Sequence, residues 1–209
     1  MTRTRIMADD EVGRAEALRI LHAGGIVAIP TDTVYGIAVS PDTPDGIAQL
    51  FKIKRRAPDR QIALLVANQG QVSVAAVPNE ASEILAAAFW PGPLTLVLPG
   101  RDGAGTIGLR LPDHACPRAL AAALGPLPTT SANLSGLPDS LNAAAVTAAL
   151  DGEIDLILDG GHTPGAVTST VVDCTVAPPT VLREGVLGSE RVRAALAAGT
   201  GRPGRGTPR

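Results

Sequence analysis

The segment FKIKRRAPDR, residues 51–60, carries five cationic side chains and one acidic side chain within ten positions. Lys52 and Lys54, the only two lysines of the sequence, both lie in it. The whole chain has a formal net charge of −2. This local concentration of cations therefore favours a binding site for a polyanion, because arginine binds phosphate oxygens bidentately and lysine acts as a point charge.

A solvated helix end, where basic residues are also favoured, is the alternative interpretation of this segment. No GxxxxGKS or GxxxxGKT motif is present, which excludes a Walker-type NTPase.

Two other segments are rich in short polar side chains. PTDTVYG, residues 30–36, follows a short apolar run and combines two threonines, an aspartate and a tyrosine. PTTSANLSG, residues 128–136, is dense in hydroxyls, and such a loop can hold phosphate or carboxylate with backbone amides and hydroxyls alone. The structural alternatives are an ordinary turn with Tyr35 packed inward for the first segment, and a capping stretch before a helix after Asn142 for the second.

Arg110 interrupts an apolar run at residues 107–111. An arginine that points into the protein needs an anionic partner, whereas an arginine on the solvent face needs none. Further along the chain, Ser169 begins one apolar run and Arg183 ends the next. The segment FWPGPLT, residues 89–95, holds the only Trp beside a rigid turn, which indicates a structural role.

Composition places these segments in one globular domain. The chain has 209 residues, of which 45% are hydrophobic, and this is enough to bury a core and too much for a disordered chain. Aromatic residues make up 2%, too few for the stacking platform of a single-strand nucleic-acid binder. Cys116 and Cys174 are far apart and form no CxxC pair, which argues against a zinc or disulfide scaffold and favours a reducing, cytoplasmic location. We find neither a signal peptide nor an apolar run of membrane-spanning length, so no membrane association is expected.

Apolar spacing predicts the elements that must position the polar segments. A first helix is expected after an acidic cap at residues 9–10, with Val12, Ala15, Leu18 and Leu21 on its apolar face. Further helices are predicted at residues 44–54, 79–89, 117–124, 142–150 and 189–198, and strands at residues 26–29, 62–67, 94–98, 107–111, 154–158, 171–173 and 181–182.

Helices and strands are intermixed along the chain without a linker. The predicted fold class is therefore α/β, a single domain over residues 9–198 with a mixed sheet and flanking helices. The Gly/Pro/Arg tail, residues 199–209, is predicted to be disordered. Because polar segments lie at the ends of predicted strands, the ligand cavity is expected there.

Seven motifs, in this order along the chain, resemble those of one enzyme family. They are PTDTVYG, the Lys-x-Arg of Lys54 and Arg56, FWPGPLT, GLRLPDH, TSANLSG, STVVD and LREG. The set is similar to the YrdC/TsaC family of L-threonylcarbamoyladenylate synthases over about residues 10–190. The resemblance implies a twisted mixed sheet around a wide, positively lined cavity, in the short single-domain form of the family. It also implies a nucleotidyltransferase that converts L-threonine, bicarbonate and ATP into L-threonylcarbamoyl-AMP and pyrophosphate.

The same resemblance implies partners and cofactors. The product would pass to a separate transferase complex that makes threonylcarbamoyladenosine in tRNA. Mg²⁺ is expected on the ATP phosphates and keeps most of its water ligands, because the sequence offers no carboxylate cluster for a dedicated metal cage. No tightly bound organic cofactor is expected, and weak RNA binding is left open.

Individual site residues follow from the matching motifs. The resemblance implies catalytic roles for Lys54 and Arg56. It implies ATP contacts for Arg56, Arg60, Thr106, Ser131, Ser140 and Arg183. It implies L-threonine contacts for Thr33, Arg110, Thr129 and Ser169.

Five positions depart from the family pattern. Ala57 and Gln61 stand where proline is common, Leu65 stands where many relatives have histidine, Thr168 replaces a frequent glutamate, and Asp139 replaces a serine that often helps to bind ATP. Ser140 is therefore expected to take the role of that serine.

Two other functions are compatible with this sequence. One is a YrdC-like module that binds double-stranded RNA or tRNA, against which the low aromatic content and the acidic body of the chain argue. The other is a carbamoyl-adenylating domain that uses carbamoyl phosphate, as in hydrogenase-maturation and O-carbamoyltransferase proteins, which usually carry further domains.

Overall fold

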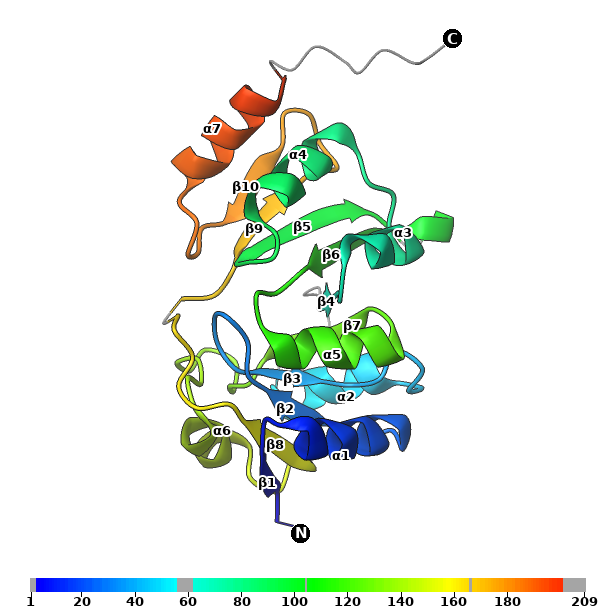
Figure 1. The fold of residues 1–209 in the computed structure, drawn as a ribbon, viewed down its shortest axis with the longest axis vertical. Coiled ribbons are helices and arrows are strands. Elements are labelled where there is room, and N and C mark those ends of the chain that lie inside the picture. The colour runs from blue at the N-terminus through cyan, green and yellow to red at the C-terminus, as the bar shows by residue number, and fades with distance from the viewer. Residues whose placement is uncertain (1–2, 56–61, 104, 166, 201–209) are drawn as a thin grey trace.

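The computed structural model describes residues 3–55, 62–103, 105–165 and 167–200. Over these residues the chain forms ten strands, seven α-helices and two short 3-10 helices (Figure 1). The strands are β1 (Arg5–Ala8), β2 (Val27–Ile29), β3 (Gly36–Ala38), β4 (Ala63–Leu65), β5 (Leu94–Pro99), β6 (Thr106–Arg110), β7 (Leu127–Ser131), β8 (Leu156–Asp159), β9 (Thr170–Asp173) and β10 (Thr180–Arg183). The helices are α1 (Glu11–His22), α2 (Gly46–Ile53), η1 (Gln69–Gln71), α3 (Val72–Ala75), α4 (Glu80–Phe89), η2 (Arg101–Gly103), α5 (Ala115–Leu124), α6 (Ala143–Leu150) and α7 (Ser189–Thr200). None of the described helices is long and apolar enough to cross a membrane.

All ten strands belong to one mixed sheet with the order β1-β8-β2-β3-β7-β4-β6-β5-β9-β10. Neighbours pair in parallel in β1–β8, β2–β8, β4–β6 and β5–β9, and the other pairs are antiparallel. The prediction of an α/β fold with a mixed sheet is confirmed. Near the middle of the sheet β7 pairs with β3 on one side and with β4 on the other, so that Thr129 lies opposite both Ala38 and Ala63. This register brings PTDTVYG and PTTSANLSG side by side.

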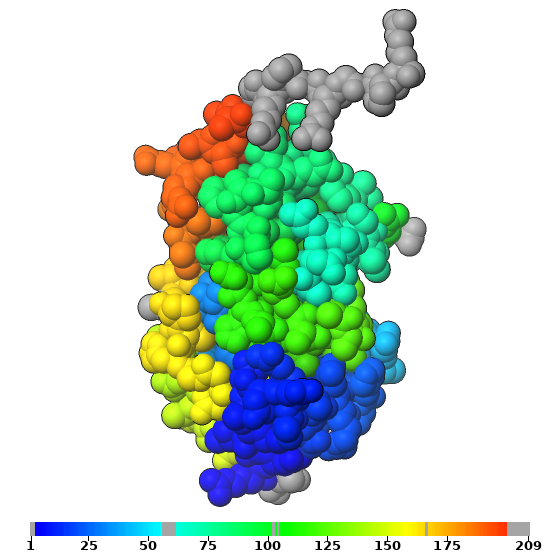
Figure 2. Space-filling view, in the orientation of Figure 1, coloured from blue at the N-terminus to red at the C-terminus, as the bar shows by residue number. Residues whose placement is uncertain are grey.

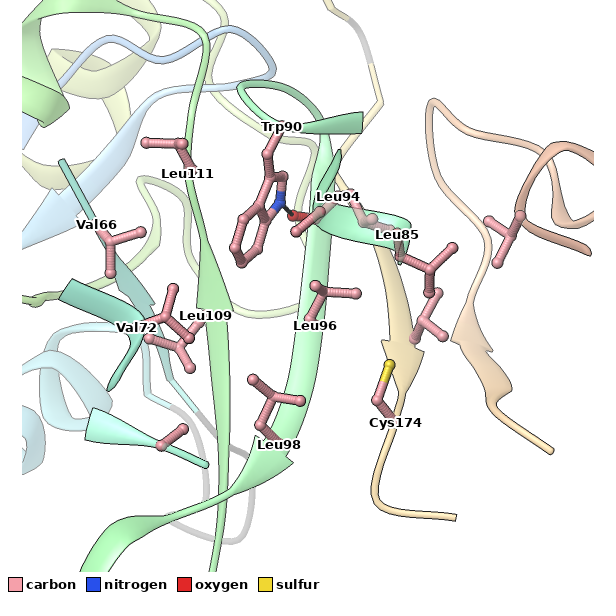
Figure 3. Packing of buried hydrophobic residues seen from close by; sticks show 14 of the residues in the cluster. Val66, Val72, Leu85, Trp90, Leu94, Leu96, Leu98, Leu109, Leu111 and Cys174 are labelled. Atoms are coloured by element: carbon pink, nitrogen blue, oxygen red, sulfur yellow. Dashed lines mark hydrogen bonds between the residues drawn. The ribbon is translucent and has the colours of Figure 1, made fainter. Parts of the chain in front are cut away.

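Helices cover the two ends of the sheet differently. Around β2, β3 and β8 the sheet is covered on both faces: α1 and α5 pack on one face, and α2 and α6 pack on the other (Figure 1). Around β5, β6 and β9, helices α3, α4 and α7 pack against one face and build a separate core (Figures 1 and 3). The opposite face of these last strands carries residues that line a cavity.

Alternation along β5 explains how one strand serves both the core and the cavity. Leu94, Leu96 and Leu98 point into the core that Figure 3 shows, while Thr95 and Val97 line the cavity. Successive side chains of a strand point to opposite faces, so each strand residue is committed to one side. In the same core the indole Nε1 of Trp90 donates to the backbone oxygen of Leu94 at 2.7 Å, which confirms the structural role predicted for this tryptophan.

The first helix begins where its cap predicts. The Asp10 carboxylate accepts a hydrogen bond from the backbone nitrogen of Gly13 at 2.8 Å, whereas Asp9 forms a two-point ion pair with Arg14. A Cβ atom on Gly13 would lie 2.0 Å from the backbone oxygen of Ala8, so only glycine lets α1 pack this closely on β1.

The apolar face predicted for this helix is partly wrong. Val12 is 69% exposed, and the buried residues of α1 are Gly13, Ala17, Ile20 and Leu21. Gly13 and Ala17, the two small residues of this face, let the helix lie close to the sheet, and this close approach cannot be recognised from hydrophobicity alone.

Three strands were not predicted: β1, β3 and β7. β1 pairs in parallel with β8, so the folded domain begins before residue 9, where the predicted boundary lies. Four of the residues assigned to the PTTSANLSG loop, Pro128 to Ser131, belong to β7 instead. At the other end α7 continues to Thr200, so a tail that starts at residue 199 starts too early. Residues 201–209 lie outside the described part of the chain.

The connection from β8 to β9 runs along one side of the molecule and links the two ends of the sheet (Figures 1 and 2). It passes close to PTDTVYG, because a Cβ atom on Gly165 would lie 2.9 Å from the backbone oxygen of Thr33. The connection from β8 to β9 therefore contributes to one side of the cavity, which Thr168 and Ser169 line.

Candidate active site

A cavity of about 200 Å³ lies beside the face of β5, β6 and β9 that is opposite α3, α4 and α7, and it extends to β3, β4 and β7. Its wall comes from β3, β4, β5, β6, β7 and β9, from the loop before β3, and from Thr168, Ser169 and Arg183. Six of the predicted site residues line this wall: Thr33, Arg110, Thr129, Ser131, Ser169 and Arg183. They come from five separate segments of the sequence, and the topology of the sheet brings them together.

Arg110 points inward, as the first of the two interpretations required, and it has the anionic partner that burial demands. Its side chain ends β6, is 8% exposed, and forms an ion pair with the carboxylate of Asp32. Its Nη1 donates to the Thr33 hydroxyl at 2.9 Å and its Nε to the backbone oxygen of Gly92 at 3.2 Å. Burial lowers the pKa of the guanidinium and Asp32 acts in the opposite direction, and an arginine remains charged at neutral pH.

The loop before β3 is held by its own hydroxyl groups. Thr31 donates from Oγ1 to the backbone oxygen of Val34 at 2.7 Å and accepts from the backbone nitrogen of Thr33 at 3.1 Å. The two threonine hydroxyls lie 3.0 Å apart. Tyr35 is fully buried, as the turn interpretation predicted, and its hydroxyl donates to the backbone oxygen of Gly161 at 2.8 Å. Burial raises the pKa of this phenol to about 12.

Lys54 contacts Ser131, a residue of the cavity wall, although Lys54 itself does not line the cavity. Its side chain is 3% exposed, and its ammonium donates to backbone and side-chain oxygens of Ser131 and Asn133 at 2.6–3.2 Å. The Ser131 hydroxyl in turn donates to the side-chain oxygen of Asn133 at 2.7 Å. Lys54 is thus hydrogen-bonded to the segment that follows β7 and adds a positive charge there.

Ser169 and Arg183 form the opposite wall. The Arg183 guanidinium donates from Nε and Nη2 to the backbone oxygen of Ser169, at 3.2 and 2.8 Å. The Ser169 hydroxyl lies 2.8 Å from that of Thr95. Partial burial lowers the pKa of Arg183, and the nearby Asp139 acts in the opposite direction. Asp139, one of the departures from the family pattern, therefore acts electrostatically on an arginine that lines the cavity.

Two predicted ATP contacts lie away from the cavity wall. The Ser140 hydroxyl is buried and donates to the backbone oxygen of Ala132 at 2.6 Å, so the expected shift of role from position 139 to 140 has no geometric support. Thr106 is exposed at the beginning of β6. Arg56 and Arg60, with the departures Ala57 and Gln61, lie outside the described residues.

Comparison with known proteins identifies the family. The Sua5/YciO/YrdC family model, described as telomere recombination, matches residues 19–185. The chain belongs to this family.

Relatives in the Sua5/YciO/YrdC family differ in length. A threonylcarbamoyl-AMP synthase of Pyrococcus abyssi is 37% identical over 187 residues, which cover 84% of this chain and 55% of that protein. A Mycobacterium tuberculosis relative is 35% identical over 209 residues, which cover 94% of this chain and 96% of that protein. The chain spans about half the length of the Pyrococcus abyssi and Bacillus subtilis relatives that it matches.

Solved structures of the Sua5/YciO/YrdC family confirm the fold. P. abyssi Sua5 complexed with L-threonine matches with a TM-score of 0.85 at 34% identity, over 92% of this chain and 59% of that chain. E. coli YciO matches with a TM-score of 0.79 at 25% identity, over 90% and 98%. The expected twisted mixed sheet of this family is therefore present.

Motif matching in this Sua5/YciO/YrdC chain left several cavity residues without a role. Thr31 and Thr95 line the wall, and Asp32 holds Arg110, yet no ligand contact was assigned to them. Thr31 and Asp32 lie in PTDTVYG, so their motif was recognised although their contacts were not. Thr95 lies in FWPGPLT, a segment for which the sequence indicates only a structural role. The alternation of β5 was the signal that places Thr95 on the cavity side.

Proposed function

We propose that this chain is an L-threonylcarbamoyl-AMP synthase, which forms L-threonylcarbamoyl-AMP and pyrophosphate from L-threonine, bicarbonate and ATP. The observation that supports this proposal best is the cavity wall itself. All four residues matched to L-threonine contacts, Thr33, Arg110, Thr129 and Ser169, line it, although they are spread over 137 positions of the sequence. The match to a Sua5 structure crystallised with L-threonine supports the same substrate.

The proposed reaction needs no protein nucleophile. The amine of L-threonine attacks bicarbonate and forms a carbamate with release of water. An oxygen of the carbamate then attacks the α-phosphorus of ATP and displaces pyrophosphate. Because carbamate and ATP are both anionic, the protein must bring them together and offset their repulsion. Arg110 and Arg183 provide positive charge at two positions of the wall, and Lys54 provides a third behind β7.

Mg²⁺ is proposed to accompany the ATP phosphates. The described residues contain no group of three or more His, Cys, Asp and Glu side chains that could hold a metal ion. A magnesium ion would be held by phosphate oxygens and water, and it would offset part of the charge of the leaving pyrophosphate.

A role in tRNA modification completes the proposal. The product is a reactive mixed anhydride, so it needs a second protein that transfers the threonylcarbamoyl group to tRNA. We place both steps in the cytoplasm, where two buried free thiols, Cys116 and Cys174, remain reduced.

The experiment that tests the proposal is mass spectrometry of a reaction that contains the protein, ATP, Mg²⁺, bicarbonate and L-threonine, with each component omitted in turn. We expect L-threonylcarbamoyl-AMP only in the complete mixture. An adenylate that forms with carbamoyl phosphate and without L-threonine would replace the proposal with a carbamoyl-adenylating activity. RNA binding without any adenylate would replace it with an RNA-binding module.

A matched pair of variants links the product to the cavity. Arg183→Gln removes a guanidinium from the wall, whereas Arg193→Gln removes an exposed guanidinium from α7. We expect the first variant to raise the KM for ATP at least tenfold, since a charge-assisted hydrogen bond is lost, and the second to behave as the wild type. Equal activity of the two variants would contradict the placement of ATP at this wall.

A further inference from the structure

The hydrogen bonds around Thr31 determine where the proton of the Thr33 hydroxyl lies. The Thr31 hydroxyl has one hydrogen and two close oxygen neighbours, the backbone oxygen of Val34 at 2.7 Å and the Thr33 hydroxyl at 3.0 Å. A carbonyl oxygen can only accept a hydrogen bond, so the hydrogen of Thr31 is used by Val34. Thr33 must then be the donor in the contact between the two hydroxyls.

The Thr33 hydroxyl is therefore left with lone pairs only. Its hydrogen points to Thr31, and one lone pair accepts from Nη1 of Arg110 at 2.9 Å. A hydroxyl oxygen has two acceptor positions, so one remains for a ligand. Thr33 is 1% exposed and lines the cavity, and the ligand atom that meets it must carry an N–H or O–H group.

The hydroxyl hydrogens of two neighbouring residues, Thr129 and Ser131, are also used within the protein. Thr129 donates to the backbone oxygen of Leu127 at 3.0 Å, and Ser131 donates to the side-chain oxygen of Asn133 at 2.7 Å. Both hydrogens are used inside the protein, so this side of the wall offers acceptors. The guanidiniums of Arg110 and Arg183 supply donors to the same wall.

We propose that Thr31 is a positioning residue that fixes Thr33 as a hydrogen-bond acceptor for the amine or hydroxyl of the bound amino acid. This inference rests on the proposed function, since it takes L-threonine as the ligand of the cavity. Without the Thr31 oxygen, the Thr33 hydroxyl can rotate and present its hydrogen to the ligand, where it opposes a donor.

A double-mutant cycle separates this role from a general structural role. Thr31→Val keeps the shape of the side chain and removes its oxygen, and Thr33→Val removes the group on which Thr31 acts. The dissociation constant of L-threonine is measured by calorimetry for the wild type, both single variants and the double variant, with the melting temperature of each. The dissociation constant of ATP is the internal control.

We expect Thr31→Val to raise the dissociation constant of L-threonine roughly tenfold, the size of one buried hydrogen bond, and to leave that of ATP unchanged. In the Thr33→Val background the same substitution should have no further effect on L-threonine, because Thr31 acts through Thr33. Thr31→Ser, which keeps the hydroxyl, should restore wild-type affinity.

An equal loss of L-threonine affinity with and without the Thr33 hydroxyl would overturn the inference, and so would an equal loss of ATP affinity. If Thr31→Val does not fold, Thr31→Cys takes its place, since a thiol is a weak donor and a weak acceptor. Failure of the proposed function is a separate result: the wild type itself would then not bind L-threonine.

Discussion

The ammonium of Lys54 lies 2.9 Å from the side-chain oxygen of Asn133, and this contact joins the end of α2 to the segment after β7. The side-chain nitrogen of Asn133 donates in turn to the backbone oxygen of Leu137 at 2.6 Å. Lys54 therefore holds the segment at Ser131 and Asn133 in place, and the Ser131 side chain of this segment lines the cavity. The charge of Lys54 and the geometry of the wall are coupled through this contact.

Lys54→Met should reduce both stability and activity. The substitution keeps the length of the side chain and removes the ammonium, so buried oxygens of Ser131 and Asn133 lose their donor. Each such group costs about 1–3 kcal/mol, and we expect the free energy of unfolding in urea to fall by at least about 2 kcal/mol. Lys52→Met is the matched control, because Lys52 is exposed on the same helix and its loss should change stability by less than about 0.5 kcal/mol. Similar unfolding curves for the two variants would show that Lys54 does not hold this segment.

Local signals in the sequence were sufficient for most helices and for seven of the ten described strands. Apolar spacing predicts a helix at residues 79–89 and a strand at residues 94–98, and the structure has α4 and β5 there. Both elements obey short-range rules. β3 and β7 do not, because β3 has three residues and β7 contains Pro128 among hydroxyl side chains. Their strand conformation depends on pairing with each other and with β4, which is a long-range effect.

The site, like the fold, could be predicted only in part from the sequence. Motif positions identified the residues that line the cavity, such as Thr33 and Ser169, but could not show which atoms are already hydrogen-bonded. Arg110 illustrates the difference: its type and position indicated an anionic partner, and only the structure shows that Asp32 is this partner. Ser140 shows what a motif position cannot reveal: its hydroxyl donates to the backbone oxygen of Ala132, a contact that the sequence does not indicate.

Asp32→Asn should destabilise the protein and loosen Arg110, which lines the cavity. The buried guanidinium of Arg110 would lose its carboxylate, and breaking one partner of a buried ion pair costs about 3 kcal/mol. Asp113→Asn is the control, because Asp113 is exposed in the loop after β6. We expect a fall of about 3 kcal/mol in the free energy of unfolding for the first variant and a change below about 0.5 kcal/mol for the second. A neutral effect of Asp32→Asn would mean that the dipoles around Arg110 are sufficient to hold it.

Tyr35 should titrate far above its usual range. Burial raises its pKa to about 12, and it is the only tyrosine of the chain, so the ultraviolet absorbance of tyrosinate reports it alone. We expect a midpoint near pH 12 in the folded protein and near pH 10 in denaturant. The folded state retains this proton more tightly than the unfolded state, so its contribution to stability is complete below pH 10 and is lost as the pH rises toward 12. A midpoint near 10 without denaturant would contradict the burial of the phenol.

Gly185→Ala should displace Arg183 from Ser169. A Cβ atom at position 185 would lie 2.2 Å from the backbone oxygen of Thr168, and a backbone atom cannot yield as the end of a flexible side chain does. Gly188 is a matched control in the same loop, because its Cβ would meet only the Glu184 side chain at 3.7 Å. We expect Gly185→Ala to lower the free energy of unfolding by about 1–3 kcal/mol and to raise the KM values for ATP and L-threonine together, while Gly188→Ala changes neither. Both KM values should rise because the clash moves two neighbouring parts of the wall at once: the backbone of Ser169 and the guanidinium that donates to it. If Gly185→Ala raised the KM for ATP alone, Arg183 would have to move without Ser169, and the hydrogen bond between them could not be what positions either residue.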